Sequence, residues 1–192
     1  MAPKVVVGAN YDFMVDGLCY DINANGTSVS VTSENTVGAR YSNLSGDVVI
    51  PPTVTYQGTT FDVTAIKQSA FMECRGITSV TIANSVTSIG SHVFSSCSNL
   101  ASVVLPNNIK TLASSLFAGT SLSSIDIPNT VKSIGNNTFQ NTKLTSIVIP
   151  NSVTTIGEDA FRRCLSLQSV TLPDGLKTIN WHLFDECNSI TA

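Results

Sequence analysis

Apolar residues recur along most of this chain with a period of 22 or 23 residues. A phenylalanine marks each period: Phe71, Phe94, Phe117, Phe139, Phe161 and Phe184. A branched aliphatic residue lies five positions before each phenylalanine: Ile66, Ile89, Leu112, Ile134, Ile156 and Ile179. A repeat of this length is typical of solenoids, in which each repeat forms one coil that stacks on its neighbours.

The period that spans residues 144–161 shows the elements expected in every coil. Ile147 and Ile149 alternate with Val148, which predicts a strand whose two isoleucines face inward and whose valine faces outward. Pro150 is expected to end this strand because proline cannot donate a hydrogen bond to a neighbouring strand.

The second half of the same period predicts a short extended piece, a corner and a helical turn. Gly157 is expected to permit a sharp corner, as Gly90 and Gly135 do in other coils. Residues 158–161 are predicted to form a short helical or 3₁₀ turn that places Phe161 in the core.

A single coil should not be stable on its own. Its inward apolar side chains contribute roughly 1.5–3 kcal/mol each. Ordering its backbone costs roughly 1–2 kcal/mol per residue, and there are 22 residues in a coil. Stacking buries both sides of each coil, so we expect stability to belong to the array.

The N-terminal part of the chain lacks the repeat and predicts β-hairpins instead. The dipeptides Asp16-Gly17, Asn25-Gly26 and Gln57-Gly58 are turn signals between strand-like runs. We therefore expect a tail or remnant at 1–10, a β-hairpin cap at 11–62 and a solenoid of about six coils at 63–192. The last coil begins a new strand and stops, so we expect the natural protein to continue past Ala192.

The repeated pattern resembles the BspA-like leucine-rich repeat family of Bacteroidetes-type bacteria. Residues 144–164 carry the pattern Leu-Thr-Ser-Ile-x-Ile-Pro-x-Ser-Val-Thr-x-Ile-Gly-x-x-Ala-Phe-x-x-Cys nearly whole, and it recurs at 77–97. The departures are local: Ala83 replaces the proline, Ala113 and Asn180 replace the glycine, and Thr120 and Thr142 replace the cysteine.

This resemblance implies both a fold and a setting. The fold would be a β-rich α/β solenoid: a right-handed leucine-rich repeat with short helical or 3₁₀ turns and an N-terminal β-hairpin cap. The setting would be a secreted or surface-anchored bacterial protein that adheres to host matrix proteins or cells. The family supplies no shared catalytic residues.

Composition narrows the function further. Charged residues make up 12% of the chain, the net charge is −3 and the isoelectric point is about 5.2, so no basic surface for nucleic acid is expected. No apolar run reaches the length of a membrane span. The apolar stretch at the N-terminus is too short for a signal peptide, and we expect a trimmed chain.

Four cysteines occupy one repeat position, three residues after a phenylalanine: Cys74, Cys97, Cys164 and Cys187. The favoured interpretation is a row of small buried thiols at a tight turn, with Thr120 and Thr142 in the same position of other coils. Disulfides Cys74–Cys97 and Cys164–Cys187 are the alternative. A metal site is disfavoured because no zinc-type cysteine pair occurs. Cys19 is expected in the core of the cap.

The sequence predicts no enzyme, cofactor or metal site. His92 and His182 lie two residues before a repeat phenylalanine, where other coils carry Ser, Asn or Asp, which indicates an exposed position. The two histidines are four coils apart and cannot act as a pair. No nucleophile elbow, phosphate-binding loop, dinucleotide fingerprint or HExxH motif is present.

The outward positions of the strands are the candidate partner-binding strip. The first row comprises Thr81, Val104, Asp126, Val148 and Thr171, and the second extended pieces add Lys110, Lys132 and Lys177. Strand propensity and solubility alone can select such residues. A binding surface for a protein or glycan is the functional interpretation, since solenoid faces suit large partners.

Three functions remain open at this point. The leading hypothesis is a non-catalytic cell-surface or secreted binding module that adheres to an extracellular protein or glycan. The second is a rigid spacer that displays another domain, and the third, disfavoured, is an accessory domain of an enzyme. We expect a monomer, although the last coil could pair with another chain through its exposed edge.

Overall fold

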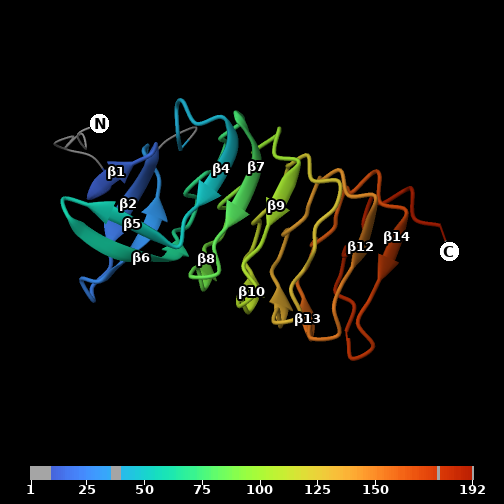
Figure 1. Cartoon of the computed structure of the whole chain (residues 1–192). Helices are drawn as coiled ribbons and strands as arrows, with labels where there is room; N and C mark the ends of the chain where they lie inside the picture. The colour runs from blue at the N-terminus through green and yellow to red at the C-terminus, as the bar shows by residue number, and fades with distance from the viewer. Residues whose placement is uncertain (1–9, 36–39, 177, 192) are drawn as a thin grey trace.

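The computed structural model describes residues 10–35, 40–176 and 178–191. An N-terminal sheet leads into a stack of coils, and the two described ends of the chain lie at opposite ends of an elongated molecule (Figure 1). The regular elements of the described residues are all β-strands.

The N-terminal sheet has the strand order β1-β2-β3-β6-β5, and β8 pairs with the end of β6. Its strands are β1 (Phe13–Val15), β2 (Leu18–Ile22), β3 (Ser28–Thr32), β5 (Thr53–Tyr56), β6 (Thr59–Ile66) and β8 (Ser88–Ile89). Asp16-Gly17 joins β1 to β2 and Gln57-Gly58 joins β5 to β6, and all four residues have φ between 49° and 80°. Positive φ at both turn residues is the tight hairpin geometry that such dipeptides favour.

The coils contribute two rows of parallel strands. The first row contains β4 (Gly46–Ile50), β7 (Ile77–Ile82), β9 (Ser102–Val104), β12 (Ser146–Val148) and β14 (Ser169–Thr171). The second row continues from β8 through β10 (Thr111–Leu112), β11 (Ser133–Ile134) and β13 (Thr155–Ile156).

Strand β4 lies within the range expected for the cap, yet it belongs to the first row of the solenoid. It pairs in parallel with β7, with Val48 opposite Val80 and Ile50 opposite Ile82. The cap and the coils are therefore joined by a shared strand row.

The first row is interrupted in its middle. Residues 124–127 occupy the repeat position of a first strand but form no strand, so β4-β7-β9 and β12-β14 are separate sheets. Ile125 is correspondingly only half-buried, whereas Val80 and Ile147 at the same repeat position are 1% and 3% exposed.

The repeat phenylalanines form one continuous column through the core. Successive ring centroids from Phe71 to Phe184 lie 5.3–5.8 Å apart, and the column begins one ring earlier than the repeat indicates, at Tyr41. Phe139 is fully buried, whereas Phe184 in the last coil is only partly buried. The predicted alignment of residues one period apart is present in the fold.

The aliphatic row is buried as far as Ile156. Ile179, which was expected to face inward in the same row, is 64% exposed. It belongs to the last coil, on which no described coil stacks.

The prediction of helical or 3₁₀ turns is wrong, because no helix occurs in the described residues. The α/β fold class is therefore wrong as well, and the fold is a strand-rich leucine-rich repeat. The backbone around each phenylalanine forms consecutive tight turns. Positive φ occurs two residues before and two residues after the phenylalanine, for example at Ser69 (57°) and Glu73 (60°).

Hydrogen bonding explains why a helix cannot form there. Alternate N–H groups donate to the next coil, as Phe71 does to the Val93 carbonyl (3.0 Å), while those between them close local turns, as Met72 does to Ser69 (3.1 Å). A helix would direct every N–H group back along its own segment. Stacking of the coils therefore takes precedence over local helix formation.

The repeat glycine is needed for close packing between coils. A Cβ atom at Gly157 would lie 2.5 Å from the backbone nitrogen of Asn136, and one at Gly90 would lie 2.5 Å from that of Gln68. Neither glycine is among the residues with positive φ. Close packing of the preceding coil therefore restricts this corner to glycine. The sequence predicts a different reason, the conformational freedom of the glycine backbone.

Candidate functional site

The outer face of the first strand row, here called the strand face, carries two aligned columns of side chains. The first column contains Val49, Thr81, Val104, Asp126, Val148 and Thr171. Strand register places Thr81 beside Val49 and Val104, and Val148 beside Thr171. The second column contains Asp47, Ser79, Ser102, Ser124, Ser146 and Ser169.

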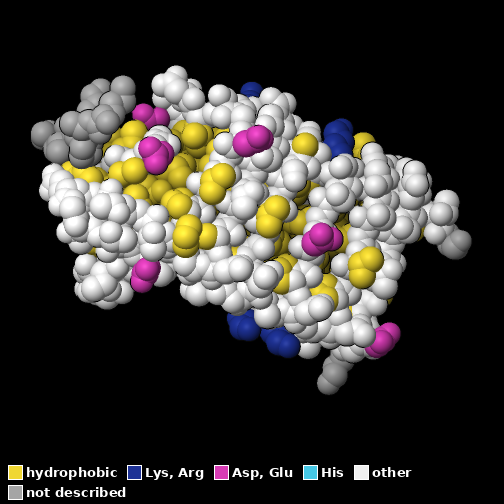
Figure 2. All heavy atoms as spheres, viewed as in Figure 1, with side chains coloured by type: hydrophobic (Ala, Val, Ile, Leu, Met, Phe, Trp, Pro, Cys, Tyr) yellow, Lys and Arg dark blue, Asp and Glu magenta, His cyan; other side chains and the backbone are white. Residues whose placement is uncertain are grey.

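Three valines are the most exposed apolar residues of the strand face. Val49, Val104 and Val148 are 62%, 56% and 65% exposed because they point outward where their strand neighbours point into the core. Hydrophobic patches separated by polar side chains run across this face in Figure 2. The strand face therefore offers apolar contacts at spaced positions.

Asp126 lies at the centre of the strand face, where the strand row is interrupted. Together with Val104, it lines a hollow of about 260 Å³ on one side, and with Val148 it lines a second hollow of about 330 Å³ on the other. Each hollow is also lined by the proline at the repeat position that follows the first strand, Pro128 or Pro150. A carboxylate between two hollows of mixed polar and apolar lining can accept hydrogen bonds or pair with a cation of a partner.

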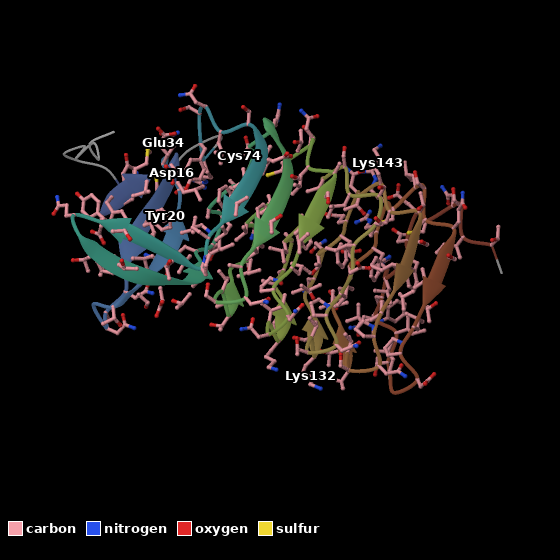
Figure 3. All side chains as sticks on the ribbon, in the orientation of Figure 1. Asp16, Tyr20, Glu34, Cys74, Lys132 and Lys143 are labelled. Carbon is pink, nitrogen blue, oxygen red and sulfur yellow. The ribbon has the colours of Figure 1, made fainter. Side chains whose placement is uncertain are left out.

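The predicted lysines do not join this surface. Lys110 and Lys132 are exposed and neighbour each other on the second row, where the Lys132 N–H donates to the Lys110 carbonyl (2.8 Å). Figure 3 shows Lys132 at the lower edge of the molecule, away from the first row. Lys177 lies outside the described residues.

Sequence reasoning missed Val49 and Asp47, which extend the strand face to the cap. The signal is present in the run Val48-Val49-Ile50-Pro51, which has the same spacing as Ile147-Val148-Ile149-Pro150. Asp47 accepts a hydrogen bond from the Ser79 hydroxyl (2.6 Å), which fixes its carboxylate at the rim of the face.

The cysteines stay free thiols and serve packing. Cys74, Cys97 and Cys164 are buried, and the Cys97 and Cys164 thiols donate to the carbonyls of Phe71 (3.0 Å) and Phe139 (3.1 Å) in the preceding coils. Thr120 makes the equivalent bond within its own coil, to Phe117 (2.9 Å). Burial raises the pKa of Cys74 to about 11, which keeps this thiol protonated and unreactive at neutral pH.

The histidines occupy turn positions with positive φ. His92 has φ of 60° and is partly buried, and His182 has φ of 58° and lies exposed 3.7 Å from Asp185. Histidine, asparagine and aspartate tolerate this backbone region better than most residues, which explains the residue types found at this repeat position. Within the described ranges, no group of three or more His, Cys, Asp or Glu residues has the geometry of a metal site.

The repeat pattern itself decides the family. Six copies of the BspA type leucine-rich repeat match residues 64–191. The chain belongs to the BspA-type leucine-rich repeat family. This confirms the resemblance found in the sequence, and the number of matched copies equals the number of repeat phenylalanines.

Solved structures of bacterial leucine-rich repeat proteins share the fold. A leucine-rich repeat protein from Bacteroides ovatus is 35% identical with a TM-score of 0.86, and the match covers 94% of this chain but 46% of that one. The leucine-rich repeat protein of T. pallidum, TpLRR, is 28% identical with a TM-score of 0.75, over 92% of this chain and 78% of that one.

A more distant likeness shows the fold alone. The pneumococcal vaccine antigen PcpA is 19% identical with a TM-score of 0.63, over 84% of this chain and 50% of that one. The comparison with curated proteins gives no match. In the part of this BspA-type chain that the structure describes, there is no helix long and apolar enough to cross a membrane.

Proposed function

We propose that this BspA-type chain is a non-catalytic binding module that acts at the surface of a bacterium or after secretion. It adheres to an extracellular protein of a host, such as a matrix or cell-surface protein, through the strand face. The observation that carries this proposal is the central arrangement of two exposed valines and two hollows around Asp126.

The rigidity of the stack supports recognition by this face. The ring column holds the coils that carry Val104, Asp126 and Val148 one above the other, so little conformational freedom is lost on binding. An extended face of this kind suits a large partner.

Each individual contact on the strand face should be weak. Its two columns contain Val, Thr, Ser and Asp, and none of their members is a Trp, Tyr or Arg, the residues that dominate strong interface anchors. Affinity would then come from many aligned contacts, or from several molecules displayed together on one surface.

The experiment is a capture assay with purified host matrix proteins, mucus and cell-surface extracts. The immobilised wild-type chain is compared with the double variant Asp126→Arg, Val148→Arg. A control variant, Glu158→Arg with Leu165→Arg, makes the same change in charge and also replaces one exposed carboxylate and one exposed aliphatic side chain, but away from the strand face. The proposal requires a partner that the control retains and the strand-face variant loses.

A rigid spacer is the second candidate, favoured by the continuous core. One ring column runs from Tyr41 to Phe184 without a gap, as a stiff stalk requires. The spacer role would replace adhesion if substitutions on every face leave attachment to the same targets unchanged.

A further inference from the structure

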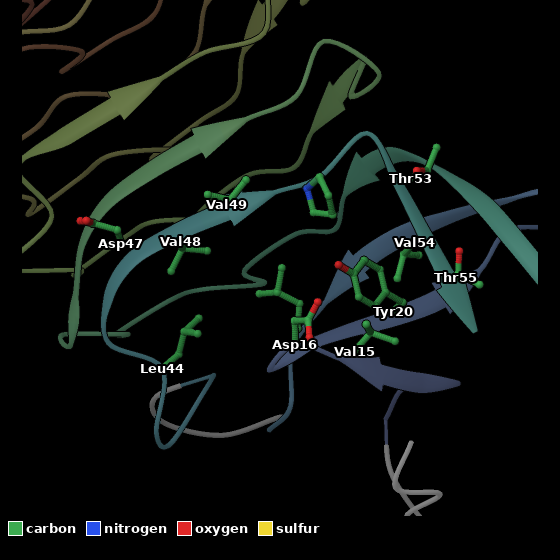
Figure 4. Close-up of a pocket in the computed structure, with 12 residues that line it drawn as sticks. Val15, Asp16, Tyr20, Leu44, Asp47, Val48, Val49, Thr53, Val54 and Thr55 are labelled. Carbon is green, nitrogen blue, oxygen red and sulfur yellow. The ribbon is translucent and has the colours of Figure 1, made fainter. Parts of the chain in front are cut away.

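A second concave site lies where the N-terminal sheet meets the strand face. The cavity has a volume of about 600 Å³, within the range typical of ligand sites. Strands β1 and β2 line one side with Val15, Leu18 and Tyr20, β5 adds Val54, and Leu44 and Val48 line the other side. Figure 4 shows Val15, Tyr20 and Val54 facing Val48 and Leu44 across this space.

The cavity lies beside the two end strands of the N-terminal sheet. Strands β1 and β5 are the two ends of the strand order, and the rings of Phe13 and Tyr56 close the gap between them by stacking at 4.4 Å. Beyond this contact, no backbone hydrogen bond joins β1 to β5 among the described residues. Val15 of β1 and Thr53 of β5 both line the cavity, together with the apolar side chains of Leu18 and Val54.

A hydroxyl without a protein partner points into this cavity. Tyr20 is 1% exposed, and its hydroxyl forms no hydrogen bond with any residue that the structure describes. In Figure 4 the hydroxyl oxygen is directed from β2 toward the β4 side of the cavity. Burial, followed by the nearby Asp16 carboxylate, raises the pKa of this hydroxyl, so it remains a hydrogen-bond donor. The hydroxyl is therefore free to donate to a carbonyl group that enters the cavity.

The charge at the rim is negative and uncompensated. Asp16 and Asp47 both line the cavity, and neither forms an ion pair within the described ranges. No lysine, arginine or histidine is among the lining residues. The entrance therefore favours a positively charged group close to an apolar one.

We propose that this cavity holds a large apolar side chain from an extended segment of a protein partner, with a lysine or arginine of that segment beside Asp16 and Asp47. The Tyr20 hydroxyl donates to a backbone carbonyl of the segment. This inference rests on the proposed function, because both take the partner to be a protein. One end of that partner would then lie on the N-terminal cap. Val49 connects the two sites, since it lines the cavity and begins the first column of the strand face.

The test is a selection from a phage-displayed library of short random peptides on the immobilised wild-type chain. The expected peptides combine a large aliphatic or aromatic residue with a lysine or arginine within two positions. Recovery of acidic peptides, or of no peptides above background, would overturn the proposal.

Two variants then locate the bound peptide. Tyr20→Phe keeps the ring and removes only the hydroxyl. It should lower the affinity for a synthetic copy of the selected peptide by about 2- to 10-fold. The double variant Asp16→Asn, Asp47→Asn should lower the peptide affinity by about 2- to 5-fold at low salt. The affinity should also depend less on ionic strength. Both variants should melt at nearly the wild-type temperature. The two aspartates form no ion pair, an asparagine at position 47 can still accept from the Ser79 hydroxyl, and the Tyr20 hydroxyl forms no hydrogen bond.

Matched controls separate the cavity from general effects. Tyr56→Phe removes a hydroxyl that bonds to Gln57 outside the cavity, and Asp62→Asn removes an exposed carboxylate on β6. Peptide affinity should be unchanged in both control variants. If Tyr20→Phe also left the affinity unchanged, the result would contradict the proposal. The strand-face variant Asp126→Arg, Val148→Arg should still bind the peptide, so failure of the peptide site and failure of the strand face are distinguishable.

Discussion

At the scale of single residues, the ring column is the largest source of stability that one substitution can remove. Phe139 is fully buried between Phe117 and Phe161, at centroid distances of 5.7 and 5.3 Å. Phe139→Ala should lower the free energy of unfolding by about 3–5 kcal/mol, measured by chemical denaturation. Phe184→Ala is the matched control and should cost clearly less, because Phe184 is stacked on one side only. A loss below about 1 kcal/mol for Phe139→Ala would show that this ring does not support the core.

The buried thiols predict a dependence of stability on alkaline pH. Burial raises the pKa of Cys74 from 9.0 to about 11, so above pH 9 the unfolded chain loses this proton before the folded chain does. The contribution of Cys74 is complete below pH 9 and is lost as the pH rises through about 11.

Cys74→Ala is the variant that isolates this effect. Denaturation of the wild type between pH 9 and 11 should show a decline in unfolding free energy that is steeper, by up to about 1.4 kcal/mol per pH unit, than that of the variant. The other buried thiols and tyrosines are the same in both proteins. Equal slopes would rule out the assigned burial of this thiol.

At the scale of elements, the contact between successive coils limits which residues fit the corner. A Cβ at Gly157 would lie 2.5 Å from the backbone of the preceding coil, whereas one at Gly175 would meet nothing within 4 Å. Gly157→Ala should therefore destabilise the chain by about 1–3 kcal/mol in thermal or chemical melts. Gly175→Ala should be nearly neutral, and a similar effect of both substitutions would refute close packing as the reason for the glycine.

The strands and the hairpin turns could be predicted from the sequence because they depend on local signals. Alternation at Ile147-Val148-Ile149 and the dipeptides Asp16-Gly17 and Gln57-Gly58 are such signals, and strands or hairpin turns occur at these places. The division into a cap at 11–62 and a solenoid at 63–192 stays a prediction.

The helical turn and the break in the first row could not be predicted in this way. Around Phe71 the backbone N–H groups alternate between their own turn and the next coil, which is a property of stacking and not of the local residues. Residues 124–127 carry the same apolar alternation as their neighbours but form no strand. For the candidate site, the sequence placed Val104, Asp126 and Val148 in one column, but it could not reveal the hollows or separate Lys132 from them.

At the scale of the whole molecule, stacking of the coils places outward residues that are one period apart in the sequence next to each other on one surface. The core column holds the coils together, and the strand face displays their outward residues from Val49 to Thr171, one per coil. The cavity at the cap lies at one end of this surface and the exposed last coil at the other. A partner that covers several coils would gain affinity from their number.

The central claim is that the partner binds to the strand face around Asp126. The most direct measurement is the dissociation constant of the captured partner for three proteins: the wild type, Asp126→Arg with Val148→Arg, and the control Glu158→Arg with Leu165→Arg. The account predicts a loss of affinity of about tenfold or more for the strand-face variant and wild-type affinity for the control. Equal affinity of all three proteins, or an equal loss in both variants, would contradict it.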